Sequence, residues 1–254
     1  MTLTVPDWAG ETVAEVPCPV VFATVSGAHL YGFPSADSDV DLRGVHLLGL
    51  RQVVGLRTGP QTLTRGGIRD GVELDVVTHD LAKFARLMLK PNGYVLEQLT
   101  SPLVIATGET HEELKALAPD CVTRGHERHY EGFARGQWEL FGRTGELKPL
   151  LYAFRVLLTG VHLMRTGEIE ANLTRLEGGP GYLGELIEAK RSAEHGGLGE
   201  IVSREKVEAD VAALRVALVE AAAGSRLRGE LAEATVAAMD DLVVRRRLEP
   251  PADA

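Results

Sequence analysis

The sequence predicts an α+β protein in which a small mixed sheet flanked by helices is followed by an α-helical C-terminal half. Two observations predict this fold class. Runs with the β-branched or alternating pattern of strands are confined to about the first hundred of the 254 residues. After about residue 105, apolar residues recur instead with helical spacing. We therefore expect two domains, a sheet-containing domain at 1–105 and a helical domain at 106–254.

Three strands are predicted in the first domain. Val20–Val25 is a β-branched run, and Asp39–Val45 alternates polar and apolar residues with the period of a half-buried strand. Gly71–Val77 begins with the same alternation. The segment 57–67, between the second and third strands, is rich in glycine and threonine and is predicted to be a mobile loop.

Helices are predicted from their caps and from their apolar spacing. Asp80 has the position of an N-cap for a helix that carries Leu81, Phe84, Leu87 and Met88 on one face. The segment 91–93 ends this helix, and Tyr94–Leu99 forms a second one. Further helical patterns lie at 109–117, 124–141, 147–166, 182–193, 203–223 and 229–247. The arginine triplet 245–247 is expected to be the solvated end of the last helix.

Composition excludes several classes of protein. With 44% hydrophobic and 25% charged residues the chain is an ordinary globular protein, and its two cysteines cannot build a disulfide framework. The net charge of −9 argues against a surface that coats nucleic acid without specificity. No apolar run reaches the roughly 20 residues of a membrane helix, and the first residues lack the features of a signal peptide. We expect a cytoplasmic protein with no membrane partner.

The strongest chemical signal is a pair of carboxylates on the second predicted strand. Asp39 and Asp41 are two residues apart, so their side chains point to the same face, about 6.5–7 Å apart along the strand. Such a pair can hold Mg²⁺, and the glycine turn at Ser26–Gly27 can bring backbone N–H groups near a phosphate. A third carboxylate is needed on a neighbouring strand, where the sequence offers Glu73 and Asp75.

These residues resemble a known family. The segment 26–32, followed by Ser-Asp-Val-Asp-Leu-Arg-Gly at 38–44, is similar to the signature of DNA-polymerase-β-type nucleotidyltransferases. Within that superfamily it resembles the predicted nucleotidyltransferases associated with RNA-repair operons. The segments 81–97 and 150–169 extend the similarity, which covers roughly residues 20–190.

The resemblance implies a nucleotidyltransferase palm at 1–105 and a catalytic role for three acids. Asp39 and Asp41 would bind two Mg²⁺ ions, for which Mn²⁺ can substitute. Asp75 is our choice for the third metal-binding acid, with Glu73 as the alternative. The implied reaction transfers a nucleoside monophosphate from an NTP such as ATP to a hydroxyl group and releases pyrophosphate. The resemblance favours an RNA 3′ end as the acceptor.

The glycine turn supplies the expected nucleotide contacts and also the main departure from the family pattern. Ser26, Gly27 and His29 in the turn, with Ser38 before the acids, are predicted to contact the nucleotide. The superfamily usually has serine directly after the turn glycine, where its hydroxyl helps to hold phosphates. Here that position is Ala28, so weaker or altered nucleotide binding is expected.

The apolar helix predicted at 147–166 carries a polar stripe. Its polar residues recur at steps of four and three, which places them on one narrow face: Lys148, Tyr152, Arg155, Thr159, His162 and Thr166. One interpretation is an ordinary amphipathic helix with a wet stripe. The other is a cleft wall facing the acidic strands, in which Lys148 and Arg155 contact the triphosphate and Tyr152 or His162 the base or sugar.

Two alternatives to RNA repair stay open. The same chemistry can act on a different acceptor, such as a protein side chain or a small molecule. The chain can also be a catalytically inactive nucleotide-binding module, for which Ala28 is the best support.

Overall fold

The computed structural model describes residues 6–36, 38–192 and 197–249, and it has an α+β fold with a five-stranded mixed sheet. The chain divides into two compact units. The sheet unit comprises residues up to 30, 39–121 and 231 onward, and the helical unit comprises 31–38 and 122–230. The predicted domains, 1–105 and 106–254, are two continuous halves, whereas both units here are discontinuous in sequence. As a division into functional domains, the boundary near residue 105 stays a prediction.

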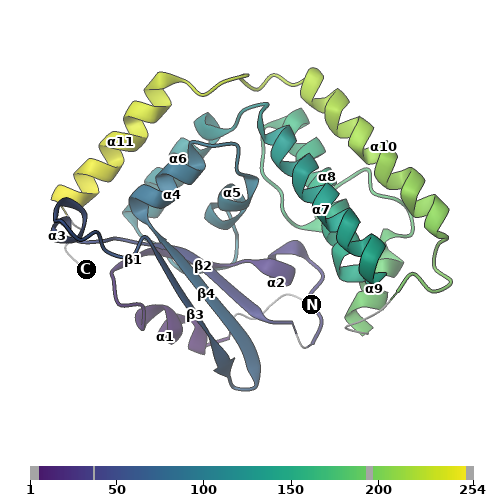
Figure 1. Ribbon diagram of the computed structural model, residues 1–254, viewed down its shortest axis with the longest axis horizontal. Coiled ribbons are helices and arrows are strands. Elements are labelled where there is room, and N and C mark those ends of the chain that lie inside the picture. The colour runs from purple at the N-terminus through teal and green to yellow at the C-terminus, as the bar shows by residue number, and fades with distance from the viewer. Residues whose placement is uncertain (1–5, 37, 193–196, 250–254) are drawn as a thin grey trace. The chain divides into compact units, whose positions relative to one another are not determined.

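The sheet unit holds all five strands and most of the short helices (Figure 1). Its elements are α1 (Trp8–Ala14), β1 (Val20–Val25), α2 (Gly27–Tyr31, whose last residue belongs to the helical unit), β2 (Val40–His46), α3 (Leu50–Val54), β3 (Thr62–Arg69), β4 (Val72–Asp80), α4 (Leu81–Met88), α5 (Gly93–Leu99), β5 (Val104–Ala106), α6 (Glu109–Cys121) and α11 (Glu233–Leu248). The helical unit is built from α7 (His126–Thr144), α8 (Leu147–Thr166), the 3₁₀ helix η1 (Leu173–Arg175), α9 (Leu183–Ser192) and α10 (Arg204–Ala223).

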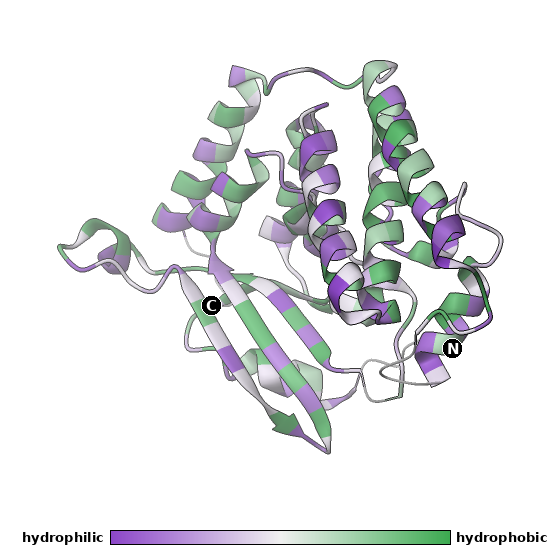
Figure 2. Ribbon diagram, turned by 45° about the vertical axis from the view of Figure 1, so that its right-hand side comes forward, coloured by the Kyte–Doolittle hydropathy of each residue, from purple (hydrophilic) through white to green (hydrophobic). Residues whose placement is uncertain are grey.

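The strand order is β3-β4-β2-β1-β5. β2 and β4 run parallel, whereas the other neighbouring pairs are antiparallel. The three predicted strands are confirmed as β1, β2 and β4, and alternating bands of hydrophobic and hydrophilic residues run along the strands in Figure 2. The parallel pairing of β2 with β4 is what brings the two acidic segments of the sequence side by side.

The prediction that residues 57–67 form a mobile loop is wrong for most of this segment. Its second half belongs to β3, which pairs with β4 along its whole length. A two-residue turn joins the strands, and both of its residues, Asp70 (φ 51°) and Gly71 (φ 79°), have positive φ. Asp-Gly is a strong hairpin signal because such a turn requires left-handed backbone. The two glycines in β3 obscured the strand pattern around that signal.

The two faces of the sheet are covered by different helices. Leu42, Leu74 and Val76 are buried together with Trp8 and Val13 of α1 on one face. On the other face, Phe22 packs edge-on against Phe84 of α4 and stacks on His111 of α6, with ring centroids 5.4 and 4.3 Å apart. Side chains alternate along a strand, so Asp41, Arg43 and Asp75 lie on this second face, with α4, α5 and α6.

Asp80 joins three segments of the sheet unit. As predicted, its side chain caps α4 by accepting a hydrogen bond from the backbone N–H of Ala82. It also accepts the N–H of Leu48 and forms a two-pronged ion pair with Arg247 of α11, at 2.6 and 2.7 Å. The arginine triplet is therefore not a solvated helix end: Arg247 is buried, and Arg246 pairs with acids of α6.

The helical unit is organised around α8, which is largely buried between neighbouring helices. Gly160 is needed at its closest contact, because a Cβ there would lie 2.9–3.2 Å from side-chain atoms of Leu218 and Tyr130. Among the described helices, α8 alone is long and apolar enough to cross a membrane, but 83% of that apolar window is buried inside the structure. Burial of this kind is typical of a core helix.

Candidate functional site

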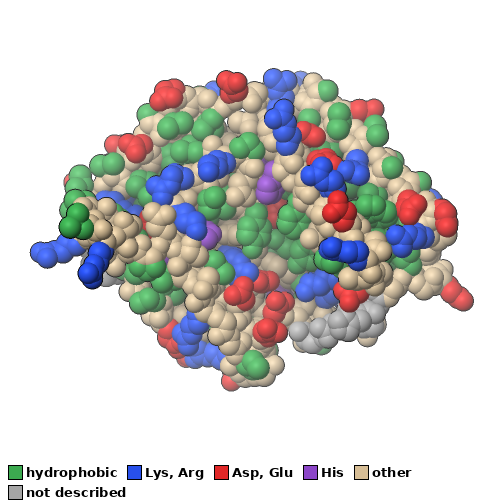
Figure 3. Space-filling view, viewed as in Figure 1, with side chains coloured by type: hydrophobic (Ala, Val, Ile, Leu, Met, Phe, Trp, Pro, Cys, Tyr) green, Lys and Arg blue, Asp and Glu red, His purple; other side chains and the backbone are tan. Residues whose placement is uncertain are grey.

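Asp41 and Asp75 are direct neighbours across the parallel pair of β2 and β4. Their Cα atoms are register partners, and both side chains point to the face opposite the α1 core. The Asp41 side chain is 17% exposed and that of Asp75 is 45% exposed. Acidic side chains gather over the sheet of this unit in Figure 3. The predicted adjacency of the Asp41 segment and a second acidic strand is thus present, with Asp75 rather than Glu73 opposite Asp41.

Arg43 bridges these two carboxylates. Its Nη2 donates to Asp41 Oδ1 at 2.6 Å and to Asp75 Oδ2 at 2.8 Å. Nη1 donates to the backbone carbonyls of Leu42 and Asp75, and Nε donates to the hydroxyl of Tyr94 at 3.1 Å. All five N–H donors of the guanidinium therefore have an acceptor. Arg43 is an integral part of this site.

The charge of Arg43 is fixed by its surroundings. Burial by itself acts to lower the pKa of Arg43, but the contacts with Tyr94, Asp41 and Asp75 outweigh it, so the pKa lies above its ordinary value. Charge-assisted hydrogen bonds of this kind are about twice as strong as neutral ones. Arg43 thus holds a permanent positive charge between the two acids. No sequence pattern indicated the contact between Arg43 and Tyr94.

Asp39 and Glu73 lie outside this bridged pair. Asp39 is half-buried and immediately precedes β2, whereas Glu73 is exposed and pairs in register with Ile68 of the edge strand β3. Within 6–36, 38–192 and 197–249, no group of three or more His, Cys, Asp or Glu side chains is arranged to hold a metal ion. The assignment of Asp39, Asp41 and Asp75 as metal ligands therefore stays a prediction.

The glycine turn lies against the Asp41 carboxylate. Gly27 has a φ of +63°, and a Cβ at this position would overlap Asp41 Oδ2. The turn is tied to β2 by the N–H of Ser26, which donates to the Asp41 carbonyl at 2.8 Å. Only glycine combines left-handed backbone with so close an approach. The turn therefore lies directly beside one of the acids, and its predicted proximity to a phosphate stays a prediction.

The Ser26 hydroxyl is directed into the protein. Ser26 is completely buried, and its Oγ has no hydrogen-bond partner among the described residues. Ala28, which replaces the usual serine, is also buried, whereas His29 is half-buried in α2. Roles for Ser26 and His29 in nucleotide binding stay predictions. A buried hydroxyl without a partner is unusual in proteins, which makes Ser26 a residue to test.

Ser38 belongs to a segment that the helical unit holds. The Lys190 ammonium, which is buried in α9, donates to Ser35 Oγ at 2.7 Å and to Ser38 Oγ at 3.4 Å. Ser38 Oγ also accepts the N–H of Ser35 at 2.9 Å. Arg191 donates to the carbonyl of Gly32 at 2.9 Å. The predicted nucleotide contact by Ser38 is untested, and no sequence pattern indicated the contribution of Lys190.

The polar stripe of α8 is buried at its centre and exposed at its ends. Lys148 is exposed and Tyr152 half-buried, whereas Arg155 is 2% exposed. The Arg155 guanidinium lies 3.7 Å from the centroid of the Tyr31 ring, a cation–π contact. Thr159 is buried and donates to a backbone carbonyl in the segment after α8. The wet-stripe interpretation is therefore wrong at the centre, and the prediction that the stripe contacts a triphosphate stays untested.

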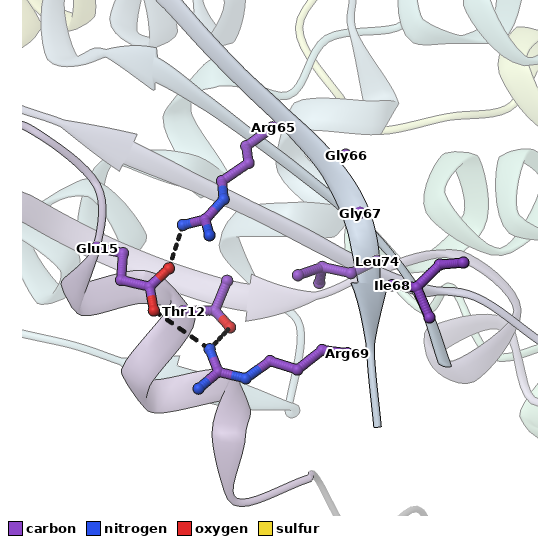
Figure 4. A pocket seen from close by; sticks show the side chains of 8 residues that line it. All are labelled: Thr12, Glu15, Arg65, Gly66, Gly67, Ile68, Arg69 and Leu74. Atoms are coloured by element: carbon purple, nitrogen blue, oxygen red, sulfur yellow. Dashed lines mark hydrogen bonds and ion pairs between the residues drawn. The ribbon is translucent and has the colours of Figure 1, made fainter. Parts of the chain in front are cut away.

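A separate pocket of about 230 Å³ lies between the β3 edge and α1 (Figure 4). Arg65 and Arg69 of β3 reach over it, and both pair with Glu15, the residue that directly follows α1. Arg69 also contacts Thr12 at 3.0 Å. The two arginines join the edge strand to α1, and the pocket contains neither Asp41 nor Asp75.

The donors of the acidic site fit a hard divalent cation. Carboxylate oxygens are the ligands that Mg²⁺ and Mn²⁺ prefer, and Asp41 and Asp75 present them from adjacent strands. Gly27 removes the side chain that would block Asp41 Oδ2. These carboxylates therefore have the donor chemistry that a divalent cation needs, beside the buried Gly27 turn.

Comparison with known proteins identifies a family and several relatives. The sequence model of a family described as "RNA repair pathway DNA polymerase beta family" matches residues 9–245. The uncharacterized protein MJ0002 of Methanocaldococcus jannaschii is 30% identical over 171 residues, which are 65% of this chain and 67% of that protein. The uncharacterized protein YcgL of Bacillus subtilis is 28% identical over 59% of this chain and 58% of its own length.

One solved structure has a weaker likeness. The crystal structure of a nucleotidyltransferase-like protein from Exiguobacterium sibiricum aligns with 96% of this chain and 79% of its own, at 12% identity and a TM-score of 0.32. That score is too low to support a structural inference.

Proposed function

Because the chain belongs to the RNA repair pathway DNA polymerase beta family, we propose that it is a metal-dependent nucleotidyltransferase. In the proposed reaction a substrate hydroxyl attacks the α-phosphorus of an NTP in line, and pyrophosphate leaves. One observation carries the proposal: Asp41 and Asp75 face each other across β2 and β4, and the Gly27 turn lies against the Asp41 carboxylate.

The chain supplies carboxylates and charge to this reaction. In the proposal Asp39, Asp41 and Asp75 hold two Mg²⁺ ions, or Mn²⁺. Such ions, when bound, favour ionisation of an attacking hydroxyl and neutralise phosphate charge. Asp75 has the more exposed side chain of the bridged pair and is our candidate for the acid nearest the substrate hydroxyl. Arg43 holds the two carboxylates together by bridging one oxygen of each.

Each unit by itself contains candidates for nucleotide contacts in this proposal. Ser26, Gly27 and His29 are the candidates in the sheet unit, and Ser38 is a candidate in the segment before β2. Lys148, Tyr152 and Arg155 are the candidates in α8. Because Lys148 is exposed whereas Arg155 is buried against Tyr31, we expect a direct phosphate contact from Lys148 and a supporting role for Arg155.

The proposed acceptor is an RNA 3′ end, acted on in the cytoplasm. The description of the family as part of an RNA repair pathway supports this choice over a protein side chain or a small molecule. The net charge of −9 is compatible with it, since binding one strand end does not need the basic surface that coats a duplex.

The test is transfer from α-labelled NTPs in the presence of Mg²⁺. The protein is given RNA with a 3′-hydroxyl, the same RNA with a blocked 3′ end, an unrelated protein and a small polyol in parallel. We expect each label transferred to the 3′-hydroxyl RNA to be matched by one pyrophosphate. The Asp39→Ala, Asp41→Ala double variant should lose at least about 10³-fold in rate. Full activity of that variant would rule out the metal assignment.

A nucleotide-binding module without turnover is the second candidate. Ala28 favours it, because the hydroxyl usual at that position is missing and the neighbouring Ser26 hydroxyl is buried. Calorimetry with each NTP and Mg²⁺ separates the two functions. Nucleotide binding without pyrophosphate release on any acceptor would support the module, and metal-dependent pyrophosphate release would exclude it.

A further inference from the structure

The carboxylate pair of the candidate site already contains a cation. Arg43 binds one oxygen of Asp41 and one oxygen of Asp75, and its side chain is only 11% exposed. When ionised, the three proposed metal ligands carry a formal charge of −3, and Arg43 adds a charge of +1. A divalent cation entering this site therefore meets an acid cluster whose charge is already reduced.

The surroundings of Arg43 argue that it stays in place when a metal ion binds. Two of its five hydrogen bonds go to backbone carbonyls, of Leu42 and Asp75, and one goes to Tyr94. Removing the guanidinium would break all three of these hydrogen bonds, each of which contributes about 0.5–1.5 kcal/mol to stability. A fixed positive charge then repels an incoming metal ion whether or not a nucleotide is present.

We propose that Arg43 is a built-in cation that keeps the affinity of the nucleotide-free site for metal ions low, so that the metal ions enter together with the triphosphate. This inference rests on the proposed function. The triphosphate supplies the negative charge and the additional oxygen ligands that the acids, partly neutralised by Arg43, lack. Arg43 is thus a positioning residue that also makes the binding of metal ions depend on the triphosphate.

The test is Mn²⁺ binding without nucleotide, measured by electron paramagnetic resonance and by calorimetry. The variants are Arg43→Gln, which removes the charge, and Arg43→Lys, which keeps it. We expect Arg43→Gln to bind Mn²⁺ at least about tenfold more tightly than the wild type, because a unit charge close to a dication is removed. Arg43→Lys should stay within about threefold of the wild type. Unchanged or weaker binding by Arg43→Gln would overturn the proposal.

Arg65→Gln is the matched control. Arg65 is also a strand arginine paired with an acid, but its partner is Glu15, which directly follows α1. It should leave Mn²⁺ binding unchanged. If Arg65→Gln tightened binding as much as Arg43→Gln, a general charge effect would replace the proposed local one.

A measurement on the wild type covers the case in which Arg43→Gln fails to fold. The affinity for Mn²⁺ is compared with and without an α,β-methylene NTP, and we expect at least a tenfold gain with the analogue. Tight binding of Mn²⁺ alone, with less than a tenfold gain, would overturn the proposal.

Turnover assays run alongside separate this inference from the proposed function. Tighter Mn²⁺ binding by Arg43→Gln in a protein that transfers no nucleotide would keep the inference and reject the function. Nucleotide transfer by the wild type, without tighter Mn²⁺ binding by Arg43→Gln, would keep the proposed function and reject this inference.

Discussion

Gly27 lies so close to Asp41 that a methyl group on its Cα would overlap the Oδ2 atom of the carboxylate. The backbone of Gly27 is also left-handed, with a φ of +63°. Two independent requirements therefore restrict this position to glycine. The first concerns the backbone, and the second concerns the space that the acid needs.

Gly27→Ala should strongly lower the rate of nucleotidyl transfer and moderately lower the free energy of unfolding. We expect a loss of at least about 10²-fold in nucleotidyl transfer, since the misplacement of a catalytic group by about 1 Å can have that effect. Mn²⁺ affinity should change as well. Gly71→Ala is the matched control, because Gly71 also has positive φ (79°) but has open space where its Cβ would lie. Equal activity losses in the two variants would show that backbone strain alone is responsible.

Asp75 and Glu73 offer a direct comparison on one strand. Both point to the same face of β4, but only Asp75 is opposite Asp41 and bonded to Arg43. We expect Asp75→Asn to lower the rate of transfer by at least about 10³-fold, and Glu73→Gln to stay within about threefold of the wild type. Pyrophosphate release at saturating NTP measures both. The opposite ranking of the two variants would assign the third acid to Glu73.

Much of this fold follows from local patterns in the sequence. The β-branched run of β1, the alternation in β2 and the Asp80 cap of α4 each have a signal within a few residues, and the structure contains all three. The six predicted helices after residue 105 are also present; α8 has the predicted bounds, and the others differ at their ends. Apolar residues recur with helical spacing because a helix must bury its apolar side chains against its neighbours.

Two of the missed elements, α1 and β5, depend on contacts between segments far apart in the sequence. α1 and β5 are short and become ordered by packing on the sheet. The role of Arg247 requires Asp80, which lies 167 residues earlier. The site shows the same division. Local spacing identified the acids. The hydrogen bond that Arg43 donates to the Tyr94 hydroxyl depends instead on how α5 packs against β2.

The ion pair of Arg247 and Asp80 should be a major contribution to the stability of the sheet unit. Both side chains are nearly buried, at 6% and 2% exposure. Arg247→Leu leaves the Asp80 charge without its partner, which typically costs about 3–5 kcal/mol. Arg245→Gln, at an exposed position of the same helix, should leave the free energy of unfolding nearly unchanged. Urea unfolding measures both, and similar values for the two variants would contradict the structural role of Arg247.

The attachment of the segment 31–38 to the helical unit can be tested at Gly32. This glycine has a φ of +87°, and a Cβ would overlap the Oδ1 atom of Asn172. Gly32→Ala should destabilise the protein by at least about 2 kcal/mol, from strain and overlap together. Gly178→Ala has the same backbone requirement, with a φ of +83°, but open space around its Cβ. It should cost only about 1–2 kcal/mol. Asn172→Ala should relieve part of the Gly32→Ala loss, and a strictly additive double variant would exclude the predicted overlap.

Acid should destabilise the protein through His126. Burial lowers the pKa of His126 from 6.5 to about 4, and its Nε2 has no partner among the described residues. The unfolded chain therefore binds a proton between about pH 6.5 and 4 that the folded protein excludes. The free energy of unfolding therefore has its full value above pH 6.5. It falls as the pH drops towards 4, by up to about 3 kcal/mol from this group. Urea unfolding at pH 7.5 and 4.5 should show that His126→Asn removes about 2 kcal/mol of this loss. An unchanged pH dependence in the variant would mean that other histidines, such as His79 with a pKa also lowered to about 4, account for it.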